Sequence, residues 1–125
     1  MKTWSDWEVI RHQVAICGRV VDGQDKPIGG IQVRIVSMPE AFSTRVSAAV
    51  SFKQRQRDDL KELPDRTLTK ENGSYYFLDL PDGKYVLNVI DTQTDSQDEK
   101  ETTVLWDKAG KVNRVLLHFK IAKYF

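Results

Sequence analysis

The chain has 125 residues, which is the size of one domain of about 100–200 residues. Hydrophobic residues make up 40% of it and charged residues 30%, a composition that indicates a globular protein and excludes a disordered one. Lys and Arg number 19 against 18 Asp and Glu, so the formal charge of +1 gives the chain no general attraction for nucleic acid or for an anionic membrane.

Residues 1–13 form an extension ahead of the first predicted strand and contain Trp4 and Trp7. They lack the apolar core of a signal peptide, and no stretch of the chain reaches the roughly 20 apolar residues of a membrane-spanning helix. We therefore expect a cytoplasmic protein without membrane insertion, either free or incorporated into a larger particle. Tryptophan side chains commonly anchor interfaces, so Trp4 and Trp7 are candidate partner contacts. The alternative is that both fold back as a lid over one open end of the domain.

Alternating apolar residues predict a half-buried strand over residues 14–21, with Val14, Ile16 and Val20 on its inner face. A turn rich in Gly, Asp and Pro separates it from a second predicted strand at residues 31–36. Polar side chains alternate with apolar ones in this second strand, so we expect one of its faces to meet water.

Residues 39–65 depart from this alternation and predict a partly helical insertion. Phe42, Val46 and Val50 recur at helical spacing, which indicates an amphipathic helix with one apolar stripe. Loops longer than about 12–15 residues are uncommon inside a compact domain unless they carry a function. The stripe must be buried against something, so its three residues are candidate partner contacts unless the domain itself covers them. We favour association with a partner.

Strand signals resume after residue 65, and Asn72-Gly73 is a strong hairpin signal between predicted strands at 66–70 and 74–79. Further strands are predicted at 84–90, 102–106 and 112–121. Ten apolar residues fall in phase to build one core: Ile16, Val20, Val33, Ile35, Tyr75, Phe77, Leu80, Tyr85, Leu87 and Val89. Seven short strands separated by turns predict an all-β, seven-stranded antiparallel β-sandwich over residues 14–125, with no linker that would divide it.

Two blocks of the sequence carry a pattern of turn glycines and core residues. The first comprises Ile16 to Asp22 and Pro27 to Ile35, and the second comprises Thr67 to Thr69, Asn72 to Phe77 and Leu80 to Val89. Together they cover about half of the chain and resemble the carboxypeptidase regulatory-like domain, a transthyretin-like β-sandwich. The resemblance implies a Greek-key arrangement of the strands. It also implies a domain that rides on larger proteins, so a separate copy is expected to join its partner non-covalently.

The sequence offers no catalytic pattern. His12 and His118 are the only histidines, and neither has the spacing to a second ligand that a metal site needs. Cys17 is the single cysteine, and the acidic stretch 91–99 lacks the spacing of a calcium-binding loop. Transthyretin-like hydroxyisourate hydrolases carry a first-strand histidine, whereas Arg19 occupies that place here. We therefore predict no catalytic residues, no cofactor and no metal, and hence no enzyme.

These features predict a non-catalytic interaction module, an accessory or structural component of a larger assembly such as bacterial surface or phage-tail-like machinery. We expect the partner to be another protein or a second copy of the chain. Nucleic acid is not expected, because the basic run at 53–57 is followed directly by acidic residues. The alternative is a carbohydrate-binding module that presents aromatic side chains to sugars. Its candidate residues are Trp4, Trp7, Tyr75, Tyr76 and Trp106.

Overall fold

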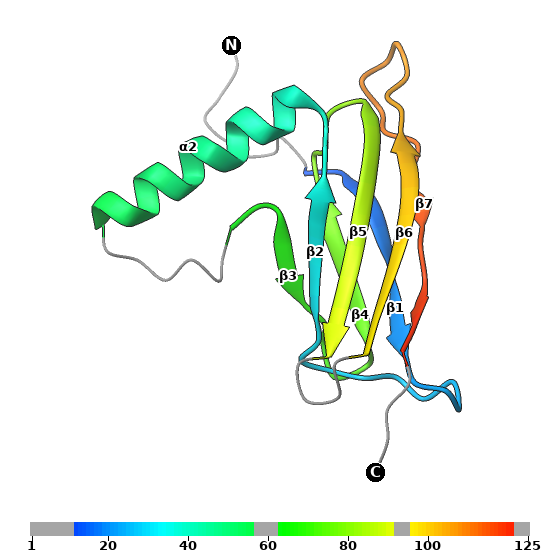
Figure 1. The fold of residues 1–125 in the computed structure, drawn as a ribbon. Coiled ribbons are helices and arrows are strands. Elements are labelled where there is room, and N and C mark those ends of the chain that lie inside the picture. The colour runs from blue at the N-terminus through cyan, green and yellow to red at the C-terminus, as the bar shows by residue number, and fades with distance from the viewer. Residues whose placement is uncertain (1–11, 57–62, 92–95, 122–125) are drawn as a thin grey trace, which may run out of the picture.

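The computed structural model describes residues 12–56, 63–91 and 96–121. Its elements in chain order are β1 (Val14–Val21), β2 (Gln32–Ser37), α2 (Glu40–Gln56), β3 (Arg66–Leu68), β4 (Ser74–Leu78), β5 (Gly83–Asp91), β6 (Ser96–Val104), β7 (Val115–Leu116) and β8 (Phe119–Lys120). The strands form two sheets (Figure 1). One has the order β4-β1-β7, with β8 also paired to β1, and the other has the order β3-β2-β5-β6. The described chain is thus mostly β, in a sandwich-like arrangement with one helix.

The last two strands run parallel to β1, whereas the sequence predicted an antiparallel sandwich. Strand β1 pairs antiparallel with β4 but parallel with β7 and β8. The reason lies in the connection after β6, which crosses from one sheet to the other at the end of the molecule where β1 begins (Figure 1). The chain therefore enters β7 in the same direction as β1. The pairings within the other sheet are antiparallel.

The core lies between the two sheets and confirms the predicted alternation. The ten predicted core residues are all buried: Ile16, Val20, Val33, Ile35, Tyr75, Phe77, Leu80, Tyr85, Leu87 and Val89. The hydroxyl of Tyr85 donates a hydrogen bond of 2.6 Å to the carbonyl of Pro81. Burial raises the pKa of Tyr85 to about 12.

A β-bulge in β1 turns Val14 away from the core. The register with β4 shifts between Val14 and Ile16. Ile16 is fully buried, whereas Val14 is half-buried and lines hollows on the outer side of the sheet. The predicted inner position of Val14 is therefore wrong, because a bulge inserts one residue and changes the alternation of the strand.

The strand predicted at 112–121 is divided into β7 and β8 at Leu117. There the chain approaches Gly18 so closely that a Cβ atom on the glycine would lie 1.9 Å from the carbonyl oxygen of Leu117. This carbonyl accepts a hydrogen bond from the hydroxyl of Tyr75, and the N–H of Leu117 donates to the carbonyl of Cys17 at 2.8 Å. Glycine is needed in β1 because only a residue without Cβ admits this approach.

The Asn72-Gly73 turn is closed tightly, because the carbonyl of Lys70 accepts the N–H of Gly73 at 2.8 Å and the N–H of Lys70 donates to the carbonyl of Ser74 at 2.9 Å. The predicted pairing of the two flanking strands with each other is wrong, because they belong to different sheets. Strand β3 pairs with β2, and β4 pairs with β1. Gly73 has a φ of 77°, and a Cβ atom there would lie 2.6 Å from the carbonyl oxygen of Val20. The local signal for a turn glycine is therefore confirmed. The pairing differs because it depends on contacts with strands that are distant in the sequence.

Helix α2 lies within the predicted insertion and is anchored at its first turn. Phe42 is 1% exposed, and its ring packs edge-on against that of Tyr85 with a centroid distance of 5.9 Å. Val46 packs against the same core, whereas Phe52 near the other end is 55% exposed. Figure 1 shows the helix leading away from the sheets. Within the described ranges, no helix combines the length and apolar character that crossing a membrane requires.

Candidate functional site

The structure describes three of the five predicted partner contacts. Trp4 and Trp7 lie outside the described residues. Phe42 is in the core, and Val46 and Val50 are half-buried. The structure thus places Phe42 according to the alternative that the sequence left open, in which the domain covers the start of the apolar stripe.

The described aromatic residues that were candidates for sugar binding are dispersed. Tyr75 is buried, and this burial raises the pKa of its hydroxyl. Trp106 is half-buried and donates its Nε1–H to the carbonyl of Leu80 at 2.7 Å. Tyr76 is 45% exposed, and Nζ of Lys70 lies 5.2 Å from its ring centroid. Among the candidates that the structure describes, Tyr76 is the one that presents its ring to solvent.

Both histidines have partners within the fold. Nδ1 of His12 lies 2.5 Å from the carboxylate of Asp79. Nδ1 of His118 accepts the N–H of Arg19 at 3.1 Å, in place of a backbone carbonyl. Cys17 lines the same hollow as His118, but no hydrogen bond between their side chains is present. Within residues 12–56, 63–91 and 96–121, no group of three or more His, Cys, Asp or Glu side chains is placed to hold a metal ion.

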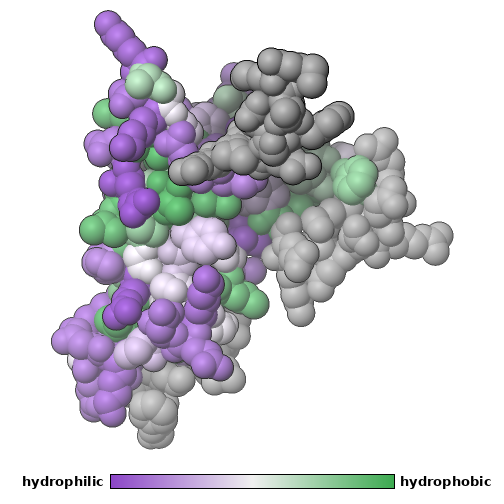
Figure 2. All heavy atoms as spheres, turned by 180° about the vertical axis from the view of Figure 1, so that it is seen from behind, coloured by the Kyte–Doolittle hydropathy of each residue, from purple (hydrophilic) through white to green (hydrophobic). Residues whose placement is uncertain are grey.

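Exposed apolar side chains gather on the outer side of the β4-β1-β7 sheet. Leu116 is 68% exposed, and strand pairing brings it near Tyr76, because Cys17 pairs with both residues. Figure 2 shows hydrophobic side chains near the middle of this side of the molecule, with hydrophilic ones around them. We call this surface the β1 face. It consists of Val14, Cys17, Arg19, Tyr76, Leu78, Arg114, Leu116 and His118.

Two adjoining hollows give the β1 face its shape. One, of about 370 Å³, lies over β1 between Arg19 and Leu116. The other, of about 640 Å³, lies between the start of β1 and the loop of residues 109–112. Val14 and Arg114 line both hollows, so the two form one continuous surface.

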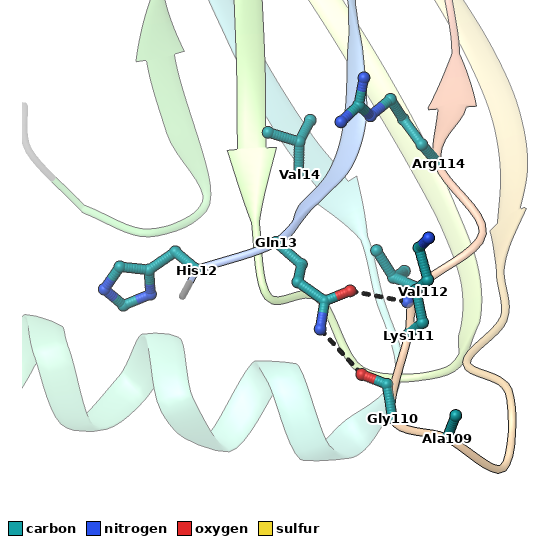
Figure 3. A pocket seen from close by; sticks show the side chains of 8 residues that line it. All are labelled: His12, Gln13, Val14, Ala109, Gly110, Lys111, Val112 and Arg114. Carbon is teal, nitrogen blue, oxygen red and sulfur yellow. Dashed lines mark hydrogen bonds between the residues drawn. The ribbon is translucent and has the colours of Figure 1, made fainter. Parts of the chain in front are cut away.

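Gln13 holds the second hollow together. Its side-chain amide nitrogen donates to the carbonyl of Gly110 at 2.8 Å, and its side-chain oxygen accepts the N–H of Val112 at 2.9 Å. Figure 3 shows this amide between the start of β1 and the loop, joined to the loop by both hydrogen bonds. Sequence reasoning missed Gln13 because its partner Gly110 lies 97 residues away and no local pattern marks such a contact.

The lining of the two hollows is cationic. Arg19, Lys111 and Arg114 are exposed, and none forms an ion pair with another described residue. Neither hollow has an Asp or Glu among its described lining residues. The whole chain carries 19 basic and 18 acidic residues, so the positive charge is a local property of this surface.

A scan against protein-family models gave no match, and a search of curated proteins found no relative of the chain. A function for the chain is therefore inferred from the shape, charge and exposed apolar side chains of the β1 face.

Proposed function

We propose that the chain is a non-catalytic β-sandwich interaction module, transthyretin-like in topology, that binds another protein through the β1 face. The observation that carries the proposal is the exposed apolar group around Leu116, which adjoins two hollows and has a polar rim. Apolar patches bordered by polar residues are typical of protein interaction sites. Such a module serves as an accessory or structural part of a larger assembly, whether in the cytoplasm or within a particle.

The outer side of the other sheet is a weaker candidate. Leu68 and Ile90 are exposed there, but Gln32 pairs with both and lies between them. Polar side chains therefore interrupt the apolar surface, whereas Tyr76 and Leu116 flank Cys17 without a charged residue between them. Leu68 is consequently a suitable control for Leu116, since both are strongly exposed leucines on strands.

Site-specific photo-crosslinking tests the proposal. A benzophenone amino acid in place of Leu116 should give a discrete crosslinked protein when cells of the source organism are irradiated. The same amino acid in place of Leu68 should give none. Both variants should melt within about 2 °C of the unmodified protein, because exposed substitutions change stability little. Equal crosslinking at the two positions, or none at Leu116, would contradict the proposal.

Carbohydrate binding is a second candidate, because Tyr76 presents its ring to solvent beside a lysine. An exposed aromatic ring with a polar neighbour is amphipathic in the way that a sugar face requires. A glycan array with the intact protein and the Tyr76→Ala variant separates the two functions. Specific sugar binding that Tyr76→Ala abolishes would replace the protein-binding proposal.

A further inference from the structure

We propose that the segment bound at the β1 face is an extended acidic peptide of a partner protein, with carboxylates on both sides of a short apolar stretch. This inference rests on the proposed function, since it names the kind of partner that the same surface takes. Its basis is the placement, on both sides of exposed apolar side chains, of cations that form no ion pair with any residue in the described ranges.

The two arginines lie at opposite ends of the apolar group. Val115 pairs with Ile16, so Arg114 lies beside the start of β1, whereas Arg19 pairs with Ser74 near the end of that strand. A strand rises about 3.3 Å per residue, which places the two arginines roughly 13 Å apart along β1. An extended peptide covers that distance with about four residues, so its carboxylates should be spaced accordingly.

The side chains between the arginines determine what lies between the carboxylates. Cys17, Tyr76 and Leu116 occupy this middle region. In an extended peptide alternate side chains point to the same face, so apolar residues at alternate positions would contact this region. Guanidinium groups bind carboxylates through charge-assisted hydrogen bonds, which gives the two ends their specificity. Lys111 continues the positive charge into the second hollow.

Nucleic acid fits this surface less well than an acidic peptide does. Phosphate binding needs several cations along a continuous strip, and a net charge of +1 provides no supporting field. Here exposed apolar side chains separate Arg19 from Arg114. A second copy of the chain also fits less well, because its exposed acidic residues on β6, Glu99 and Glu101, flank Lys100 and no apolar residue.

Fluorescence anisotropy with defined peptides tests the inference. The probe is a labelled seven-residue peptide in which two glutamates at each end flank Ser-Leu-Ser, so that the inner glutamates are four residues apart and share one face with the leucine. It should bind, and the version with glutamine in place of glutamate should bind at least about tenfold more weakly. The version with lysine should not bind. Affinity for the glutamate peptide should fall as salt is raised, because exposed charge pairs are screened.

Matched protein variants locate the interaction. Arg114→Glu and Arg19→Glu should each weaken binding of the glutamate peptide by about tenfold, since each removes an attraction and adds a repulsion. Lys84→Glu makes the same change of charge on the other sheet and should leave the affinity unchanged. Arginine variants that bind like the intact protein would overturn the inference, as would equal affinity for the glutamate and glutamine peptides.

Three further outcomes also decide against the acidic peptide. The first is no binding of the glutamate peptide at millimolar concentration, and the second is tighter, Arg114-dependent binding of a single-stranded oligonucleotide. The third is a concentration-dependent dimer in light scattering that Arg114→Glu abolishes, which would make a second copy the occupant. If Leu116 crosslinks to a protein while the peptides fail, only this inference is wrong. If Leu116 does not crosslink, the proposed function itself is wrong.

Discussion

Gly18→Ala should lower the free energy of unfolding by about 3–5 kcal/mol. The added Cβ would lie 1.9 Å from the carbonyl oxygen of Leu117, and ordinary contact begins at 3.4 Å, so this backbone must move by about 1.5 Å. The displacement breaks the hydrogen bond from the hydroxyl of Tyr75 and disturbs the 2.8 Å bond from the N–H of Leu117 to Cys17. Losing both hydrogen bonds costs about 1–1.5 kcal/mol each, and overpacking adds about 1–2 kcal/mol.

Urea unfolding and calorimetry measure this loss. With about 2.1 cal/mol/K of unfolding entropy per residue, 3–5 kcal/mol corresponds to a fall in Tm of roughly 11–19 °C for a chain of this length. Gly23→Ala is the control and should cost nothing, because no atom lies within 4 Å of its Cβ position. Tyr75→Phe removes the same hydrogen bond, so Gly18→Ala and Tyr75→Phe together should fall short of additivity by about 1 kcal/mol. A loss under about 1 kcal/mol for Gly18→Ala would refute this reasoning.

Two other substitutions test how helix α2 is anchored to the core and how the stability of the fold changes at low pH. Phe42→Ala should lower the free energy of unfolding by about 3–4 kcal/mol, because it empties a buried site. Phe52→Ala is the control and should lower it by less than about 0.5 kcal/mol in the same urea titration, because Phe52 is exposed. Equal losses would show that α2 is not anchored at Phe42. Although partial burial opposes it, hydrogen bonds from the N–H of Gln13 and from His12 hold the pKa of Asp79 below its ordinary 3.8. Ionised Asp79 therefore stabilises the fold above pH 3.8, and this contribution is lost as pH falls through the lower folded value. Below pH 3.8 the Tm of the intact protein should fall more steeply with pH than that of the Asp79→Asn variant. Asparagine is a suitable replacement because it tolerates the φ of 54° at this position. Parallel curves of Tm against pH would contradict the role assigned to Asp79.

The inward and outward positions of most strands could be predicted from alternation. Leu116 and His118 are out of phase with Phe119, and Arg19 is out of phase with Val20, so their outward orientation followed from the same pattern. The exception is Val14, where a bulge changes the phase. The non-catalytic role and the protein partner stay predictions, since they concern contacts with other molecules.

The candidate site could not be assembled from the sequence. Arg19 and Arg114 are far apart in the chain, and they border the same surface only because β7 pairs parallel to β1. Local propensity carries no information about which strands pair, and it predicted a hairpin at Asn72-Gly73 where the chain changes sheets. Apolar phase is set by each residue and its near neighbours, so the core was readable from the sequence alone. Strand partners are set by how distant segments share one core, so only the tertiary structure decided where the β1 face lies and which cations border it.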